Sequence, residues 1–101
     1  MKDPLFKWSG EYAGFIYGGR LFDASSDYIG WIEDDGRCWD SGGAFLGELV
    51  EGSYVLRRSA MATPASRAAR AHPATPAMPA RRADRAGRAT RAGWDDALED
   101  L

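Results

Sequence analysis

The chain has 101 residues, enough for one small domain, and a formal net charge of −2. Residues 1–56 hold four basic and ten acidic residues, a net charge of −6. Residues 57–94 hold nine basic residues and one acidic residue (net +8), and residues 95–101 hold four acidic residues and no basic one (net −4). The single cysteine excludes an intrachain disulfide, and no apolar run has the length of a signal peptide or a membrane span, so we expect a cytoplasmic protein.

Aromatic residues are concentrated in the first half of the chain. Eleven of the twelve Phe, Trp and Tyr residues precede residue 55. A segment without aromatic or β-branched residues buries too little surface to offset the entropy lost on ordering. We therefore expect the core to come from residues 1–57.

Two patterns recur within this half at the same, nearly constant interval. The first pattern is aromatic–x–Gly–x–aliphatic, where x is any residue. It comprises Tyr12, Gly14, Ile16; Tyr28, Gly30, Ile32; and Phe45, Gly47, Leu49. The second is an apolar pair, found at Leu5-Phe6, Leu21-Phe22, Cys38-Trp39 and Val55-Leu56. The shared interval indicates a structural repeat.

The segments between the two patterns are rich in turn-forming residues, such as Gly18-Gly19 and Asp34-Asp35-Gly36. Each repeat is therefore predicted to be a β-hairpin, and the aspartates near the hairpin ends are expected to form turns. The predicted strands are 4–8, 12–17, 20–24, 28–33, 37–40, 45–50 and 53–57.

Side chains alternate between the two faces of a strand. The glycine-centred face is apolar in every copy, so we assign it to the core and expect neighbouring rings to cover the bare glycine backbone. The opposite face carries Phe15, Tyr17 and Trp31, which form the candidate ligand face.

With these residues the chain resembles the four-fold β-flower family, in which short β-hairpins radiate as petals around a shallow central barrel. The resemblance covers residues 4–57. It implies an all-β fold of repeated antiparallel hairpins arranged as a shallow β-flower or barrel, but no particular reaction. The outline is also similar to that of tubby-like lipid-binding domains, which raises lipid head-group binding as an idea.

The chain departs from the family pattern at its start. It has three complete hairpins and a leading strand, residues 4–8, that aligns with the second strand of a petal whose first strand is absent. Either this strand closes the ring against the last hairpin, or a second chain completes the ring. Self-association is therefore one hypothesis.

Residues 58–93 are predicted to be a disordered tail, because they are rich in Ala, Arg and Pro. An arginine-rich flexible segment is suited to weak binding of nucleic acid or an acidic partner. The candidate arginines are Arg81, Arg82, Arg85, Arg88 and Arg91. The alternative is that this composition reflects bias in the coding sequence.

Residues 94–101 form a short acidic amphipathic segment. Trp94, Leu98 and Leu101 have helical spacing and are surrounded by acids, which predicts a short helix or docking segment. Four alternatives are open for this segment: it folds back on the domain, it contacts the arginines, it engages a partner, or it frays.

No residue set indicates catalysis, a metal site or a cofactor. The only histidine, His72, lies in the predicted tail, and Cys38 occupies a position taken by Leu or Val in the other repeats. We therefore expect a non-catalytic binding or scaffold module rather than an enzyme. The alternative is association with nucleic acid or an acidic partner through the arginine-rich tail.

Overall fold

The computed structural model describes residues 2–101, which form one all-β sheet. None of these residues belongs to a helix that is long and apolar enough to cross a membrane. The strands are β1 (Asp3–Phe6), β2 (Tyr12–Tyr17), β3 (Arg20–Asp23), β4 (Tyr28–Ile32), β5 (Arg37–Asp40), β6 (Phe45–Val50), β7 (Tyr54–Arg58) and β8 (Trp94–Asp96).

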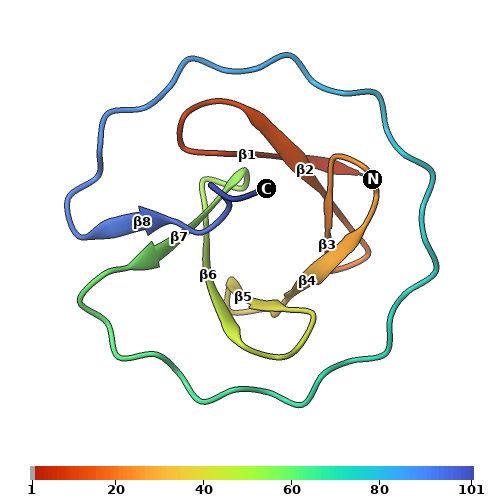
Figure 1. The fold of residues 1–101 in the computed structure, drawn as a ribbon, viewed down its shortest axis with the longest axis horizontal. Helices are drawn as coiled ribbons and strands as arrows, with labels where there is room; N and C mark the ends of the chain where they lie inside the picture. Colours follow the sequence, from red (N-terminus) through yellow and green to blue (C-terminus); the bar gives the residue numbers. More distant parts are fainter. Residues whose placement is uncertain (1) are drawn as a thin grey trace.

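The sheet is antiparallel throughout, and its strands follow the chain order from β1 to β8. The strands curl around a centre, so that the hairpins β2–β3, β4–β5 and β6–β7 form three petals (Figure 1). The seven strands expected before residue 59 are all present, with bounds close to the predicted ones. The prediction of repeated antiparallel hairpins is confirmed.

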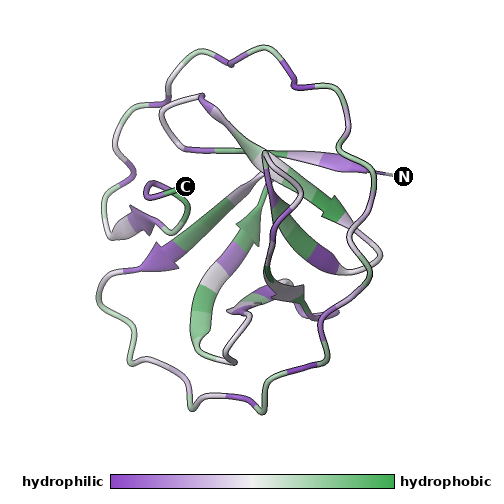
Figure 2. Cartoon of the chain, turned by 45° about the vertical axis from the view of Figure 1, so that its right-hand side comes forward, coloured by the Kyte–Doolittle hydropathy of each residue, from purple (hydrophilic) through white to green (hydrophobic). Residues whose placement is uncertain are grey.

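The centre of the sheet is built from the first member of each recurring apolar pair. Leu5, Leu21, Cys38 and Val55 are fully buried in one cluster, which Leu98 completes. Apolar strand segments point toward this centre in Figure 2. The four-fold spacing of the sequence therefore becomes a four-fold arrangement in space.

The glycine-centred face does not form a single interior. Ile16, Ile32 and Leu49 pack against the central cluster, whereas Tyr12 and Phe45 are buried in two outer clusters. A register shift in each of the pairs β1–β2, β3–β4 and β5–β6 explains the difference, because it separates the aromatic residue from the aliphatic one.

The repeated glycines allow close approach, but to backbone rather than to rings. A Cβ atom at Gly14 would lie 2.0 Å from the carbonyl oxygen of Phe22, and one at Gly30 would lie 1.9 Å from that of Trp39. Gly47 is less restricted, at 2.7 Å from the Leu56 oxygen. The expectation that rings cover these glycines is therefore corrected.

The structure does not show the disordered tail predicted over residues 58–93. Residues 59–93, which we call the strap, lack regular secondary structure but follow a defined path around the whole sheet (Figure 1). The molecule is a disc with extents of 36 × 35 × 22 Å, whose circumference is about 110 Å. A strap of extended residues at ~3.1 Å each spans about 108 Å, enough for one circuit.

The strap returns the end of the chain to the sheet. β8 pairs with β7, and Leu98 is 1% exposed within the central cluster. The predicted helix over residues 94–101 is therefore a strand followed by turns, and the segment folds back on the domain. The strand that neighbours β7 on its outer side therefore comes from the same chain.

Replacing Gly30 with alanine is expected to lower the free energy of unfolding by about 3 kcal/mol, because the added methyl group overlaps the Trp39 carbonyl. Gly19→Ala is the matched control, since Gly19 has a φ of 74° but open space around it, and costs about 1 kcal/mol. Urea denaturation measures both. Equal losses for the two variants would contradict the close approach.

Candidate functional site

Three connections at the edge of the disc have the same backbone hydrogen bonds, and we call them the outer turns: residues 7–11, 23–27 and 40–44. In the second, Asp23 N–H donates to the Asp27 carbonyl and Ser26 N–H to the Asp23 carbonyl, and equivalent bonds close the other two. The Asp23 and Asp40 carboxylates each accept two further backbone N–H bonds, so the expected turn-forming role of these aspartates is observed.

Aromatic rings line the edge of the disc, and arginines of the strap cover several of them. The guanidinium carbon of Arg67 lies 4.6 Å from the ring centroid of Trp39, and that of Arg70 lies 4.8 Å from that of Trp31. On the other side, Arg85 lies 4.0 Å from Phe6. A cation over a ring face is attracted by the ring quadrupole. We call this surface the aromatic rim.

Carboxylates and backbone groups strengthen the same contacts. Glu33 forms ion pairs with Arg67 (3.2 Å) and Arg70 (3.3 Å), and Glu51 pairs with Arg88 (2.8 Å). Glu51 raises the pKa of the Arg88 guanidinium. The indole N–H of Trp8 donates to a strap carbonyl, that of Ala89, at 2.8 Å. The strap is therefore held by rings, charges and hydrogen bonds together.

The strap has a strict three-residue repeat that the sequence analysis missed. Alanine occupies every third position from residue 62 to residue 92, and the residue before it is always Met, Pro or Arg. Polyproline II helices have three residues per turn, so one residue per triplet faces the same side. Met61 packs on the Trp31 cluster, and Pro64, Pro73, Pro76 and Pro79 are half-buried beside exposed alanines. This period was the signal for an ordered strap.

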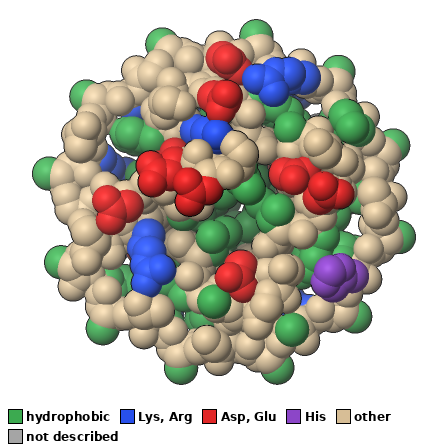
Figure 3. Space-filling model, viewed as in Figure 1, with side chains coloured by type: hydrophobic (Ala, Val, Ile, Leu, Met, Phe, Trp, Pro, Cys, Tyr) green, Lys and Arg blue, Asp and Glu red, His purple; other side chains and the backbone are tan. Residues whose placement is uncertain are grey.

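The alanines of the repeat face solvent. Small apolar side chains are visible around the outline of the molecule in the space-filling view (Figure 3). In most triplets the first position therefore meets the rim and the second position faces away from it. Third-position residues also contribute, because His72 lies against Tyr28 and Arg81 against Tyr12.

The candidate ligand face is not a shared open surface. Phe15 and Trp31 are each 1% exposed, Phe15 stacked on Phe22 and Trp31 beneath Arg70. Tyr17 is 44% exposed, with the Lys2 ammonium 5.3 Å from its ring. Of these three candidate residues, Trp31 is the one that the strap covers, through Arg70.

Four of the five candidate nucleic-acid arginines lie against rings. Arg81 lies over Tyr12, Arg85 over Phe6, Arg88 over Trp8 and Arg91 over Trp94. Arg82 is exposed. Arg67 and Arg70 make equivalent ring contacts, although they were not among the candidate arginines.

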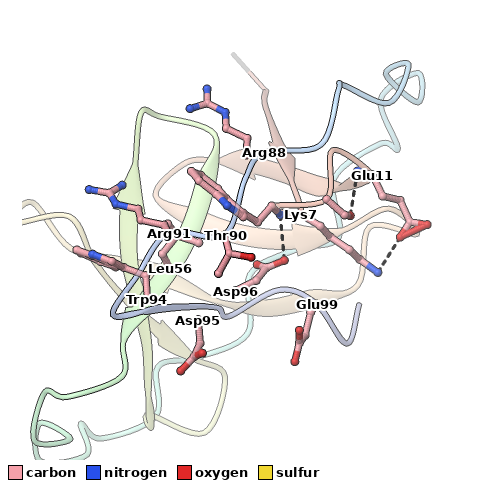
Figure 4. A pocket seen from close by; sticks show the side chains of 12 residues that line it. Lys7, Glu11, Leu56, Arg88, Thr90, Arg91, Trp94, Asp95, Asp96 and Glu99 are labelled. Atoms are coloured by element: carbon pink, nitrogen blue, oxygen red, sulfur yellow. Dashed lines mark hydrogen bonds and ion pairs between the residues drawn. The ribbon is translucent and has the colours of Figure 1, made fainter.

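The candidate docking segment lies at the seam between β8 and the connection after β1. A cavity of about 470 Å³ opens there, with the Asp96 carboxylate between the strap and the β1 side (Figure 4). Asp96 accepts hydrogen bonds from the backbone N–H groups of Trp8 and Leu98, each at 3.0 Å. Asp96 therefore joins the two ends of the sheet. Trp94 is half-buried, and Leu101 is 43% exposed.

Three side chains of types that often serve in catalysis, those of Cys38, His72 and Tyr12, pack against other residues of the chain. Burial raises the pKa of the Cys38 thiol to about 12, with a smaller contribution from Asp35, which disfavours the reactive thiolate. His72 packs edge-on against Tyr28, with ring centroids 5.0 Å apart. Burial also raises the pKa of Tyr12, although the charges of Arg82 and Arg81 oppose this.

Hairpin petals in a curled sheet, with an apolar centre of four-fold spacing, define an all-β flower. A family model described as 4-fold beta flower protein matches residues 1–97, so the chain belongs to this family. The match extends well beyond residues 4–57, on which the resemblance was based, and includes the strap and β8. No curated protein and no solved structure matches the chain.

Leu98→Ala is expected to cost about 2–5 kcal/mol of stability, because Leu98 fills the centre of the flower. Leu101→Ala, at the exposed end of the same segment, is the control and should change stability by less than about 0.5 kcal/mol. Thermal and urea unfolding measure both effects. A neutral Leu98→Ala would show that the segment does not belong to the core.

Cys38 is expected to resist alkylation in the folded protein. A rise in pKa from 9.0 to about 12 lowers the thiolate fraction at pH 8 by roughly a thousandfold, and burial adds steric protection. Mass spectrometry after iodoacetamide treatment, with and without urea, measures the difference. Equal rates in the two conditions would contradict the buried position.

Proposed function

We propose that this protein is a non-catalytic binding module whose working surface is the aromatic rim. Its ligand is an extended, arginine-rich segment, and in this chain that segment is the strap. The module acts as a scaffold on which such a segment is held in one conformation.

The observation that carries this proposal is the repeated placement of strap arginines over rings. Arg67, Arg70 and Arg85 lie within 4.0–4.8 Å of Trp39, Trp31 and Phe6. Trp31 and Trp39 belong to one buried cluster and Phe6 to another, so the contacts occur at two separate places around the rim. A surface that repeats one contact chemistry along an extended chain has the form of a peptide-binding groove.

Arginine suits this surface better than lysine does. Its planar guanidinium stacks on a ring and still donates hydrogen bonds at its edge, as Arg67 and Arg70 do to Glu33. The strap also loses less entropy on binding than a flexible chain would, because its four prolines restrict the free backbone. Both features favour binding of an extended ligand without a large apolar interface.

Association with nucleic acid through the strap is the second candidate. The exposed Arg82 and the partly exposed side chain of Arg67 (49%) favour it. Most strap arginines are engaged by rings and several by carboxylates, so phosphate contacts would compete with contacts already made. The rim contacts therefore favour the binding module.

Arg67→Ala/Arg70→Ala is expected to loosen the strap without unfolding the sheet. The two substitutions remove two ring contacts and the ion pairs to Glu33, worth about 1 kcal/mol together at these half-exposed positions. Hydrogen–deuterium exchange should become roughly fivefold faster across residues 59–75, while β2–β5 remain protected.

Arg82→Ala is the control, because it removes a strap arginine that lies over no ring among the described residues, although it removes one charge rather than two. Arg67→Lys/Arg70→Lys keeps the charge and should give an intermediate effect. Equal exchange in the Arg82→Ala and Arg67→Ala/Arg70→Ala variants would refute the binding role of the rim.

A further inference from the structure

One position of the three outer turns is glycine in two copies and serine in the third. Gly10, Ser26 and Gly43 occupy equivalent positions of the repeat, and all have positive φ, of 98°, 65° and 94°. Serine rarely adopts such a φ, whereas glycine does so at little cost. The turns are otherwise closed by the same backbone bonds.

At the two glycine turns, the strap makes an identical contact. Arg67 N–H donates to the Gly43 carbonyl at 2.7 Å, and Arg85 N–H donates to the Gly10 carbonyl at 2.7 Å. A Cβ atom at either glycine would lie 1.9 Å from the carbonyl oxygen of the same arginine. The strap thus approaches these turns too closely for any residue but glycine.

The strap advances nine residues from one petal to the next. His72 lies against Tyr28 and Arg81 against Tyr12, so strap residues nine apart meet tyrosines that are one repeat apart. Arg67 and Arg85 are separated by two such steps, and halfway between them is Pro76. Nine residues at ~3.1 Å span about 28 Å, which is a quarter of the circumference.

This register places Pro76 opposite Ser26. Proline has no backbone N–H, so it cannot make the bond that Arg67 and Arg85 make. The Ser26 side chain is 4% exposed, and its hydroxyl has no hydrogen-bond partner among the described residues. The middle outer turn therefore lacks the strap contact found at the other two.

We infer that the outer turn and the strap residue above it act as a matched pair that determines which residue each petal accepts. A glycine turn accepts arginine, through the backbone bond and a ring such as Phe6 or Trp39. The serine turn accepts proline, which leaves room for the serine Cβ. The inference rests on the proposed function and specifies its ligand: an extended peptide of Arg-Ala-x and Pro-Ala-x triplets, with arginine selected at the two glycine turns.

The test is a double-mutant cycle in the full chain, with Pro76→Arg, Ser26→Gly and both together. Pro76→Arg alone adds a backbone N–H at residue 76, but the serine turn keeps this N–H at a distance from its own carbonyl. The amide of residue 76 should therefore exchange rapidly. In the double variant that amide should be protected at least tenfold. The change in melting temperature of the double variant should exceed the sum of the changes in the two single variants by about 4 °C.

The reciprocal cycle converts a glycine turn, with Gly43→Ser, Arg67→Pro and both together. Gly43→Ser alone should lower the melting temperature more than the double variant does. Proline removes the N–H bond that holds the strap on this turn, so the carbonyl of residue 67 can move away from the serine Cβ. Additive effects in both cycles, with an unprotected amide at position 76, would overturn the matched pairing. If Arg67→Ala/Arg70→Ala still loosens the strap, the binding role of the rim stands despite that result.

Discussion

The stacking of guanidinium groups on aromatic rings is the interaction on which the completed fold depends. The strap has few large apolar side chains, so it cannot be held by a core of its own. Arg67, Arg85 and their neighbours instead use rings that belong to the petals. Only because the strap follows the rim does the chain return to β7, where β8 pairs and Leu98 closes the centre.

The hairpins were predictable because their signals are local. Glycine and aspartate fix the turns, and apolar residues recur at a spacing that matches the petals, so the seven strands before residue 59 follow from nearby residues. The face assignment failed in part, because register shifts after Leu5, Leu21 and Cys38 move the aromatic residue away from the aliphatic one. A strict alternation rule does not include such shifts.

The strap was mispredicted for a different reason. Its composition alone indicates disorder, and the rings that order it lie far earlier in the chain, as Arg67 with Trp39 and Arg85 with Phe6 show. The three-residue repeat was present in the sequence and distinguishes the strap from a random mixture of the same residues. Length matters as well, since the residues between Arg58 and Trp94 must complete one circuit before the two can pair.

The pairing of β7 with β8 also sets the order of assembly. Each of the first seven strands pairs with its neighbour in the chain, so these hairpins need only short loops to close and are expected to form first. β8 instead closes a long loop that begins at Arg58, and Leu98 enters the centre only when the whole strap has been made. Until the strap has completed its circuit, the centre lacks Leu98 beside Leu5 and Val55, so the centre of the flower is the last part to exclude water.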